Sequence, residues 1–238
     1  MRTFRQNCSM YCVVNGALLS EAEAGISVRD LSVQRGYGVF DFFRLVGNKP
    51  LFIDQHLDRL WHSAEGLRLT VPVSRELLMQ QVHDLIQKNN LPDSSIRITI
   101  TGGSSIDGFT PASPTVIITQ QYFNPPLAEQ QQNGIVLATY NHQRQLPHIK
   151  TIDYLTAVWL QPWSKEQRAD EVLYCNNDEV TECPRSNVFV VTGNKTIVTP
   201  AANVLPGITR SYVLQLAAIG FKVEERSLLL TELYTAKE

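Results

Sequence analysis

The sequence predicts an α/β protein of the mixed α+β type, divided into two domains. Runs typical of β-strands occur along the whole chain and alternate with segments in which apolar residues recur at helical spacing. The 238 residues, of which 43% are hydrophobic, can bury one large core or two smaller ones. The segment 120–134 is rich in Pro, Gln and Asn, which is typical of a domain linker.

The first domain, residues 1–120, is expected to begin with β structure and to contain two helices. Asn15 and Gly16 separate two strand-like runs, and this pair tolerates the positive φ angles of a two-residue hairpin. Ser74 can cap the second helix, which ends near Asn89, ahead of Pro92. The expected elements are strands at 11–14, 17–20, 39–46 and 50–54, helices at 56–67 and 75–89, and strands at 96–103 and 115–122.

The linker is assigned to residues 121–133, and residues 134–238 form the second domain. Its last helix is expected from Ile208 to Ile219, because Gly220 can take the left-handed conformation that ends a helix. The other expected elements are a strand at 135–140, an apolar helix after Lys150, and strands at 170–175, 186–191, 195–199 and 221–226.

Composition excludes several classes of partner. The 21 Lys plus Arg against 23 Asp plus Glu give a formal charge of -2, too weak a field to hold nucleic acid or an anionic membrane by electrostatics alone. No segment approaches the ~18 apolar residues of a membrane span. The four cysteines contain no C-x-x-C pair, which predicts reduced thiols in a cytoplasmic protein without a metal site. A small-molecule partner is expected.

Lys150 is the lysine best placed for covalent chemistry. It lies at a strand-to-helix junction between apolar residues, whereas the other six lysines occupy turns, helix ends or polar segments. Partial burial at this junction favours the neutral amine, the form that can make a Schiff base. The alternative is an ordinary surface lysine, because buried ionisable groups are rare.

Two further charged residues stand beside apolar segments. Glu182 precedes the apolar run of EVTECPRSNVF, where a carboxylate can pair with a cationic ring nitrogen or with an arginine; the alternative is a solvated turn residue. Arg59 lies in QHLDRL on the first expected helix. It can grip a phosphate with two hydrogen bonds, or it can simply pair with Asp58 or Glu65.

The segment LPGITR, 205–210, predicts an anion site at a helix start. Pro206 and Gly207 come directly before the helix, so that its first backbone N–H groups, its dipole and the Thr209 hydroxyl can meet a phosphate. The alternative is an ordinary helix start, since proline is common at that position.

Taken in this order, the segments resemble the fold-type IV pyridoxal-phosphate enzymes. These are the class IV aminotransferases, which include branched-chain aminotransferases, D-amino acid transaminases and aminodeoxychorismate lyases. The resemblance spans nearly the whole chain and rests on RGYGVFDFFR, DQHLDRL, IKTIDYL, EVTECPRSNVF, IVTP and LPGITR. It implies a small N-terminal domain, a larger C-terminal domain and pyridoxal 5′-phosphate as cofactor. It also implies a further C-terminal strand, relative to which the second domain would be truncated at ELYTAKE.

The resemblance assigns cofactor-binding roles to Arg59, Lys150, Tyr154, Glu182, Ile208 and Thr209. By this resemblance Lys150 is the catalytic residue, which attaches the cofactor and transfers a proton, and Glu182 hydrogen-bonds the pyridine nitrogen. Arg59 and the Gly-Ile-Thr backbone hold the phosphate. Tyr154 resembles the tyrosine that donates to the cofactor's phenolic oxygen in the branched-chain group, although it follows the lysine by one residue fewer than is usual there.

The same resemblance bears on the substrate. The loop TGGSSIDGFTP, 101–111, lacks the arginine and histidine typical of D-amino acid transaminases and the arginine-glycine motif of the lyases. Arg97 resembles the arginine with which branched-chain enzymes meet the side-chain carboxylate of glutamate; pairing with a surface acid is the alternative. Tyr37 and Phe42, with Phe40 and Phe43, can wall an apolar pocket or belong to the core.

The sequence therefore predicts a homodimeric, pyridoxal-phosphate-dependent aminotransferase that transfers the amino group of a branched-chain or other apolar L-amino acid to 2-oxoglutarate. Three alternatives remain open: an enzyme similar to aminodeoxychorismate lyase, a D-amino acid transaminase, and a non-catalytic scaffold, because fold alone does not decide chemistry.

Overall fold

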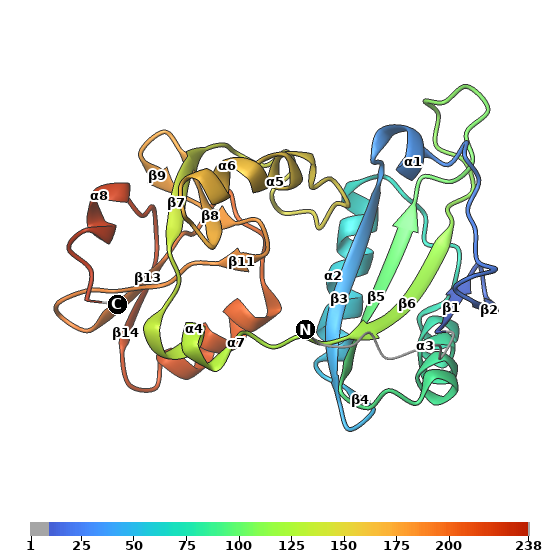
Figure 1. The fold of residues 1–238 in the computed structure, drawn as a ribbon, viewed down its shortest axis with the longest axis horizontal. Coiled ribbons are helices and arrows are strands. Elements are labelled where there is room, and N and C mark those ends of the chain that lie inside the picture. Colours follow the sequence, from blue (N-terminus) through green and yellow to red (C-terminus); the bar gives the residue numbers. More distant parts are fainter. Residues whose placement is uncertain (1–9, 238) are drawn as a thin grey trace. The chain divides into compact units, whose positions relative to one another are not determined.

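A computed structural model describes residues 10–237, and the chain divides into two compact units (Figure 1). Unit 1 extends to Asn124 and also contains Lys150–Asp153. Unit 2 comprises Pro125–Ile149 and the chain from Tyr154 onward. The mixed α+β architecture predicted from the sequence is confirmed. The segment 121–133, predicted as a linker, holds the end of strand β6 and helix α4 (Ala128–Asn133).

Unit 1 is built on a six-stranded antiparallel sheet with the strand order β2-β1-β6-β5-β3-β4 (Figure 1). Its elements are β1 (Tyr11–Val14), β2 (Ala17–Ser20), α1 (Leu31–Arg35), β3 (Gly38–Val46), β4 (Lys49–Pro50), α2 (Ile53–Gly66), α3 (Arg75–Asn89), β5 (Ser94–Thr101) and β6 (Val116–Tyr122). The predicted β1–β2 hairpin turns at Asn15 and Gly16, whose φ angles are 49° and 85°. Ser74 caps α3, as predicted, by accepting from Leu77 N–H.

The strand predicted at 50–54 is wrong beyond Pro50. Pairing with β3 ends after Leu51, whose N–H donates to Arg44 O. Phe52 then adopts a left-handed φ of 53°, which turns the chain into α2 three residues earlier than predicted. Asp54 lies in the first turn of this helix, where a negative side chain is favoured by the helix dipole.

The two faces of β3 have different surroundings. Alternate side chains of a strand point to opposite faces, so Asp41 and Phe43 share one face, and Phe40 and Phe42 share the other. Helix α2 covers the first face: the Phe43 ring centroid lies 5.4 Å from that of His56. Phe43 therefore belongs to the core, while Phe40 and Phe42 lie on the face away from α2.

The segment Lys150–Asp153 pairs with the start of β3, on the edge that β4 leaves unpaired. Thr151 forms an antiparallel bridge with Val39, and Phe40 N–H donates to Lys150 O over 2.9 Å. Lys150 N–H in turn donates to Ser63 Oγ of α2 over 3.1 Å. Gly38 allows this close packing, since a Cβ there would lie 3.1 Å from Ile152 Cδ1. The backbone of Lys150 is thus held by both a strand and a helix.

Unit 2 contains three small sheets. Its strands are β7 (Leu137–Asn141), β8 (Glu171–Asn176), β9 (Glu179–Val180), β10 (Glu182–Cys183), β11 (Ser186–Asn187), β12 (Val190–Val191), β13 (Thr196–Thr199) and β14 (Lys222–Glu225). Besides α4, its helices are α5 (Leu155–Trp159), α6 (Gln161–Glu166), α7 (Ile208–Ala217) and α8 (Leu230–Leu233). The sheets are β7-β8-β9, β10-β11 and β12-β13-β14. A core cluster joins them through Leu173, Cys175, Val180, Cys183, Val190, Val198 and Leu228.

Three expectations for unit 2 need correction. The helix after Lys150 consists of two short helices, α5 and α6, and the strand at 186–191 is split into β11 and β12. Helix α7 ends at Ala217, followed by Ala218 in the right-handed conformation. The left-handed ending predicted at Gly220 is wrong, because Gly220 is not among the described glycines that have a positive φ angle.

Residues 10–237 contain neither a membrane-spanning helix nor a cluster of metal-binding side chains. No helix in this range has the length and apolar character needed to cross a membrane. The same residues hold no group of three or more His, Cys, Asp and Glu side chains suited to a metal ion.

Candidate active site

Arg59 is fixed by a buried carboxylate. Its Nε and Nη2 donate to the two oxygens of Asp41, each over 2.9 Å. His56 Nδ1 lies 2.6 Å from Asp41 Oδ1. Asp41 is fully buried on β3, and Arg59 and His56 come from the face of α2 that covers it. Arg59 therefore pairs with Asp41, a partner that was not among the alternatives Asp58 and Glu65.

The charge of Asp41 depends on these partners. Burial by itself would raise the pKa of Asp41, but hydrogen bonds from His56 and Arg59, together with their positive charges, bring it below the usual value. A depressed pKa in the folded state contributes stability that is complete above the ordinary pKa of aspartate. This contribution is lost as the pH falls through the lowered pKa.

We expect Asp41→Asn to lower the free energy of unfolding by about 3–5 kcal/mol at neutral pH, since it leaves Arg59 buried without its carboxylate. Urea denaturation at several pH values measures this loss, which should shrink towards acid pH as Asp41 of the wild type becomes protonated. Asp58→Asn is the matched control: Asp58 is 68% exposed, pairs with Arg75, and should cost less than about 1 kcal/mol. Equal costs for the two variants would contradict this account of Asp41.

Lys150 and Arg97 meet on the other face of the unit 1 sheet. The Arg97 guanidinium carbon lies 3.6 Å from the centroid of the Phe40 ring, and Lys150 Nζ lies 4.7 Å from the same centroid. Arg97 Nε also donates to Thr99 Oγ1 over 3.3 Å. Phe42 pairs with Arg97 across β3 and β5. Two cationic groups thus share one aromatic ring, which attracts positive charge to its face.

Tyr37 lies just before β3, with its hydroxyl turned to the backbone. The hydroxyl donates to Leu67 O, beyond the end of α2. The ring is in close contact with Gly102, where a Cβ would lie 2.8 Å from Tyr37 Cδ1. Tyr37 therefore links the end of α2 to the start of β3.

Glu182 is a buried carboxylate in unit 2, which excludes the alternative of a solvated turn residue. It is 4% exposed. Its Oε1 accepts from Arg144 Nε over 2.7 Å, and its Oε2 accepts from Leu205 N–H over 2.9 Å. Asn187 Nδ2 lies 3.5 Å from the same Oε2. The predicted pairing of Glu182 with an arginine is thus confirmed by Arg144.

The thiol beside Glu182 is not poised for nucleophilic chemistry. Burial, and then the charges of Glu171 and Glu182, raise the pKa of Cys183 to about 12. The thiolate is the reactive form of cysteine, so this side chain stays inert at neutral pH.

The LPGITR segment leads into α7 as predicted. Gly207 is the N-cap residue, and no side chain of the described chain caps this end. Ile208 is buried and Thr209 is exposed. Gly207 is required by its neighbour, since a Cβ there would lie 2.0 Å from Asn187 Oδ1. Because Leu205 N–H binds Glu182, unit 2 brings the predicted phosphate segment and the predicted ring-nitrogen ligand together.

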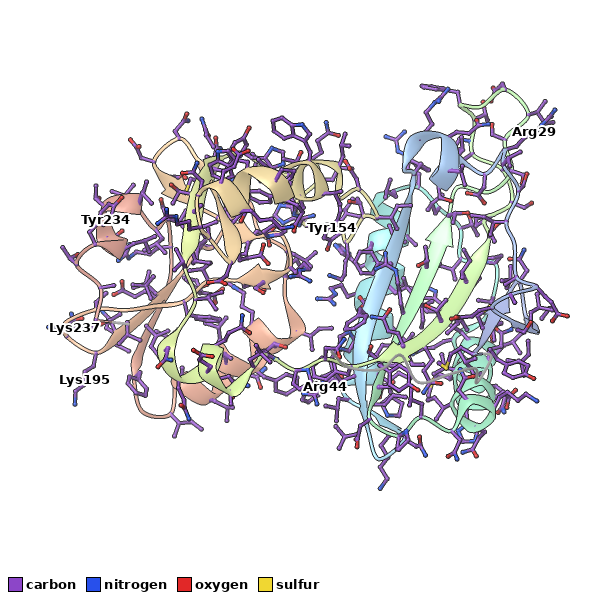
Figure 2. The ribbon with its side chains drawn as sticks, in the orientation of Figure 1. Arg29, Arg44, Tyr154, Lys195, Tyr234 and Lys237 are labelled. Carbon is purple, nitrogen blue, oxygen red and sulfur yellow. The ribbon has the colours of Figure 1, made fainter. Side chains whose placement is uncertain are left out.

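Tyr154 is half-buried and is the N-cap residue of α5 in unit 2, where Figure 2 labels it. Lys150 and Tyr154 are assigned to different units, although only three residues lie between them in sequence.

Each unit by itself holds groups that suit part of pyridoxal 5′-phosphate. A phosphate needs cations and N–H donors; unit 1 contains the Arg59 guanidinium, and unit 2 contains the start of α7, which has no side-chain capping hydrogen bond. A protonated ring nitrogen needs a carboxylate, and a carboxylate has about four lone-pair positions, of which Glu182 uses three. Lys150 provides the amine that an aldehyde requires.

The sequence pointed to none of the residues that hold this set in place, which are Asp41, Ser63, Arg144 and Asn187. One signal was available for Arg144. It is the only Asp, Glu, Lys or Arg between Gly134 and Lys150, a stretch otherwise made of apolar and neutral polar residues. A single charge in such a segment is typical of a side chain with a specific partner.

Comparison with known proteins identifies the family. Residues 38–238 match the family described as amino-transferase class IV. The chain is 31% identical over 241 residues to a protein of Methanocaldococcus jannaschii provisionally named a branched-chain-amino-acid aminotransferase, covering 96% of this chain and 82% of that one. It is 29% identical to the D-alanine aminotransferase of Bacillus licheniformis, covering 96% and 83%.

Solved structures agree with this match. The branched-chain aminotransferase of Thermoproteus uzoniensis with norvaline superimposes with a TM-score of 0.87 at 27% identity, covering 97% of this chain and 82% of that one. The predicted fold type IV is confirmed by this similarity, as is the prediction of an enzyme over a non-catalytic scaffold. The chain belongs to the class IV aminotransferases, enzymes that depend on pyridoxal 5′-phosphate.

Proposed function

We propose that this aminotransferase moves the amino group of a branched-chain or other apolar L-amino acid to 2-oxoglutarate. The observation that carries the proposal is the Phe40 ring, which lies under both the Arg97 guanidinium and Lys150 Nζ. Arg97 offers a positive charge to the side-chain carboxylate of 2-oxoglutarate. Phe42, which is half-buried on the same face, offers an apolar surface to an aliphatic side chain.

The proposed cofactor ligands follow the donor set. Arg59 and the backbone N–H groups of Ile208 and Thr209 hold the phosphate, and Glu182 accepts from the ring nitrogen. Tyr154 donates to the phenolic oxygen. When bound, pyridoxal 5′-phosphate supplies an electron sink for the charge left at the substrate Cα after its proton is removed.

Lys150 is the proposed proton carrier of the reaction. Its Nζ would take the proton from the substrate Cα and deliver it to C4′ of the cofactor, because one amine on a fixed backbone can reach both atoms. The bonds from Phe40 N–H and to Ser63 Oγ hold that backbone, so that only the side chain of Lys150 has to move.

A D-amino acid donor is the second candidate, since the sequence identity of this chain to a D-alanine aminotransferase, 29%, is close to its identity to the branched-chain relative, 31%. The loop 101–111 argues against it. It contains neither arginine nor histidine, and so lacks the cationic side chains expected to grip the carboxylate in that subgroup. The lyase alternative lacks its arginine-glycine motif in the same loop.

We also propose a homodimer and a cytoplasmic location. Val28, Ile106 and Phe109 are at least 80% exposed on neighbouring loops of unit 1, and apolar exposure of this extent favours an interface. Cys12, Cys175 and Cys183 are buried free thiols, as expected for a reducing compartment. Sedimentation velocity of the wild-type protein tests the dimer.

Half-reaction spectroscopy tests the substrate proposal. Adding L-leucine or L-isoleucine to the loaded enzyme should convert the bound cofactor to its pyridoxamine form, and 2-oxoglutarate should restore the starting spectrum. Arg97→Gln should raise the apparent Kd of 2-oxoglutarate in this titration by roughly 10-fold or more. The apparent Kd of L-leucine should stay nearly unchanged, because only 2-oxoglutarate carries a side-chain carboxylate. A response to D-alanine alone, or formation of pyruvate from aminodeoxychorismate, would replace the proposal by the corresponding alternative.

A further inference from the structure

Arg144 holds one oxygen of Glu182 and a backbone carbonyl at the same time. Its Nε donates to Glu182 Oε1 and its Nη2 donates to Pro147 O, both over 2.7 Å. The Arg144 side chain is 15% exposed and that of Glu182 is 5% exposed. Two opposite charges are therefore buried against each other.

The other oxygen of Glu182 has different partners. Oε2 accepts from Leu205 N–H and lies 3.5 Å from Asn187 Nδ2. With both oxygens bonded, the carboxylate cannot rotate without breaking a hydrogen bond. One acceptor position of the carboxylate remains for a further donor, and its direction is set by the bonds already made.

Arginine suits this task better than lysine does. The planar guanidinium presents its N–H groups in a fixed fork, so the bond to Pro147 O sets the direction from which Nε meets Glu182. An ammonium on a flexible stem carries the same charge without that fixed direction.

We infer that Arg144 is a positioning residue, which acts on the cofactor only through Glu182. It holds the carboxylate in the orientation in which the remaining lone pair accepts from the ring nitrogen. This inference rests on the role proposed for Glu182. Replacing Arg144 should therefore weaken the binding of a ligand that has a ring nitrogen and leave the binding of a ligand without one unchanged.

The test compares two ligands on the cofactor-free wild-type enzyme and its variants. One ligand is pyridoxal 5′-phosphate, and the other is its analogue with the ring nitrogen replaced by a CH group. Arg144→Gln should raise the Kd of pyridoxal 5′-phosphate by roughly 10-fold or more, as expected for a weakened charged hydrogen bond, and the Kd of the analogue by less than about 2-fold. Arg144→Lys should bind pyridoxal 5′-phosphate more tightly than Arg144→Gln and less tightly than the wild type.

Arg185→Gln is the matched control. Arg185 also pairs with a glutamate of unit 2, Glu171, but it is 77% exposed, and neither Kd should change when it is replaced. If Arg144→Gln fails to fold, Arg144→Lys carries the test, because the ratio of the two Kd values within one variant does not depend on how much protein is folded. An equal rise of both Kd values, or no change in either, would overturn the inference.

The ratio of the two Kd values in Glu182→Gln tests the proposed role of Glu182 separately. The ratio of the two Kd values should change in Glu182→Gln if that carboxylate meets the ring nitrogen. If the ratio is unchanged in Glu182→Gln, the role of Glu182 fails. If it changes in Glu182→Gln but not in the Arg144 variants, only the inference about Arg144 fails.

Discussion

Lys150→Ala should no longer bind pyridoxal 5′-phosphate covalently and should turn over amino acids about 10²- to 10⁴-fold more slowly, the range expected when a proton-transfer group is removed. The fold should survive, because the bonds to Ser63 and Phe40 use the backbone of Lys150 and alanine keeps them. Steady-state kinetics and the visible absorbance of the purified protein measure the two effects.

Borohydride reduction followed by peptide mapping identifies the attachment site directly. The wild-type protein should carry the label at Lys150. Lys165→Ala is the matched control, since Lys165 is an exposed lysine on α6 and should leave both labelling and turnover unchanged. A label on another lysine, or full turnover in Lys150→Ala, would show that the covalent chemistry belongs elsewhere.

Glu182→Gln should keep the cofactor but lose about 10- to 150-fold in turnover. A hydrogen bond to a charged group contributes about 1.5–3 kcal/mol, and each 1.36 kcal/mol corresponds to a tenfold change in rate. The structure adds a second effect. Because Arg144 then lies buried without its carboxylate, the free energy of unfolding should fall by about 3–5 kcal/mol.

The two effects of Glu182→Gln can be measured separately, by turnover at saturating cofactor and by urea denaturation of the cofactor-free protein. Glu171→Gln provides the comparison, because Glu171 also pairs with an arginine of unit 2, the exposed Arg185. Glu171→Gln should lower the free energy of unfolding by less than about 1 kcal/mol and leave turnover unchanged. Wild-type turnover in Glu182→Gln would remove the ring-nitrogen role from this carboxylate.

Local patterns in the sequence predicted most of the secondary structure. The Asn15-Gly16 turn and the Ser74 cap act within a few residues, and both were confirmed. The errors arose where a contact overrode the local pattern. PLFID has the composition of a strand, yet Phe52 turns left-handed so that the next residues can enter α2 and bury Leu57 and Leu60 against the sheet.

The residues of the candidate site also fall into those that local motifs predicted and those that depend on distant contacts. Motifs indicated the residues whose own chemistry is unusual, such as Lys150 and Glu182. Their supports were not predicted, because each depends on a partner far along the chain: Arg59 is 18 residues from Asp41, and Arg144 is 38 residues from Glu182. Hydrogen bonds of this kind leave no periodicity in a single sequence.

The attachment of Lys150–Asp153 to β3 bears on how the chain folds during synthesis. Unit 1 has all its named strands once Tyr122 has left the ribosome, but the edge of β3 at Val39 and Phe40 stays unpaired until Asp153 follows. An open strand edge is a template for pairing with other chains. The nascent protein therefore passes through an interval in which it is prone to aggregate, and a fragment ending at Asn124 would remain in that state.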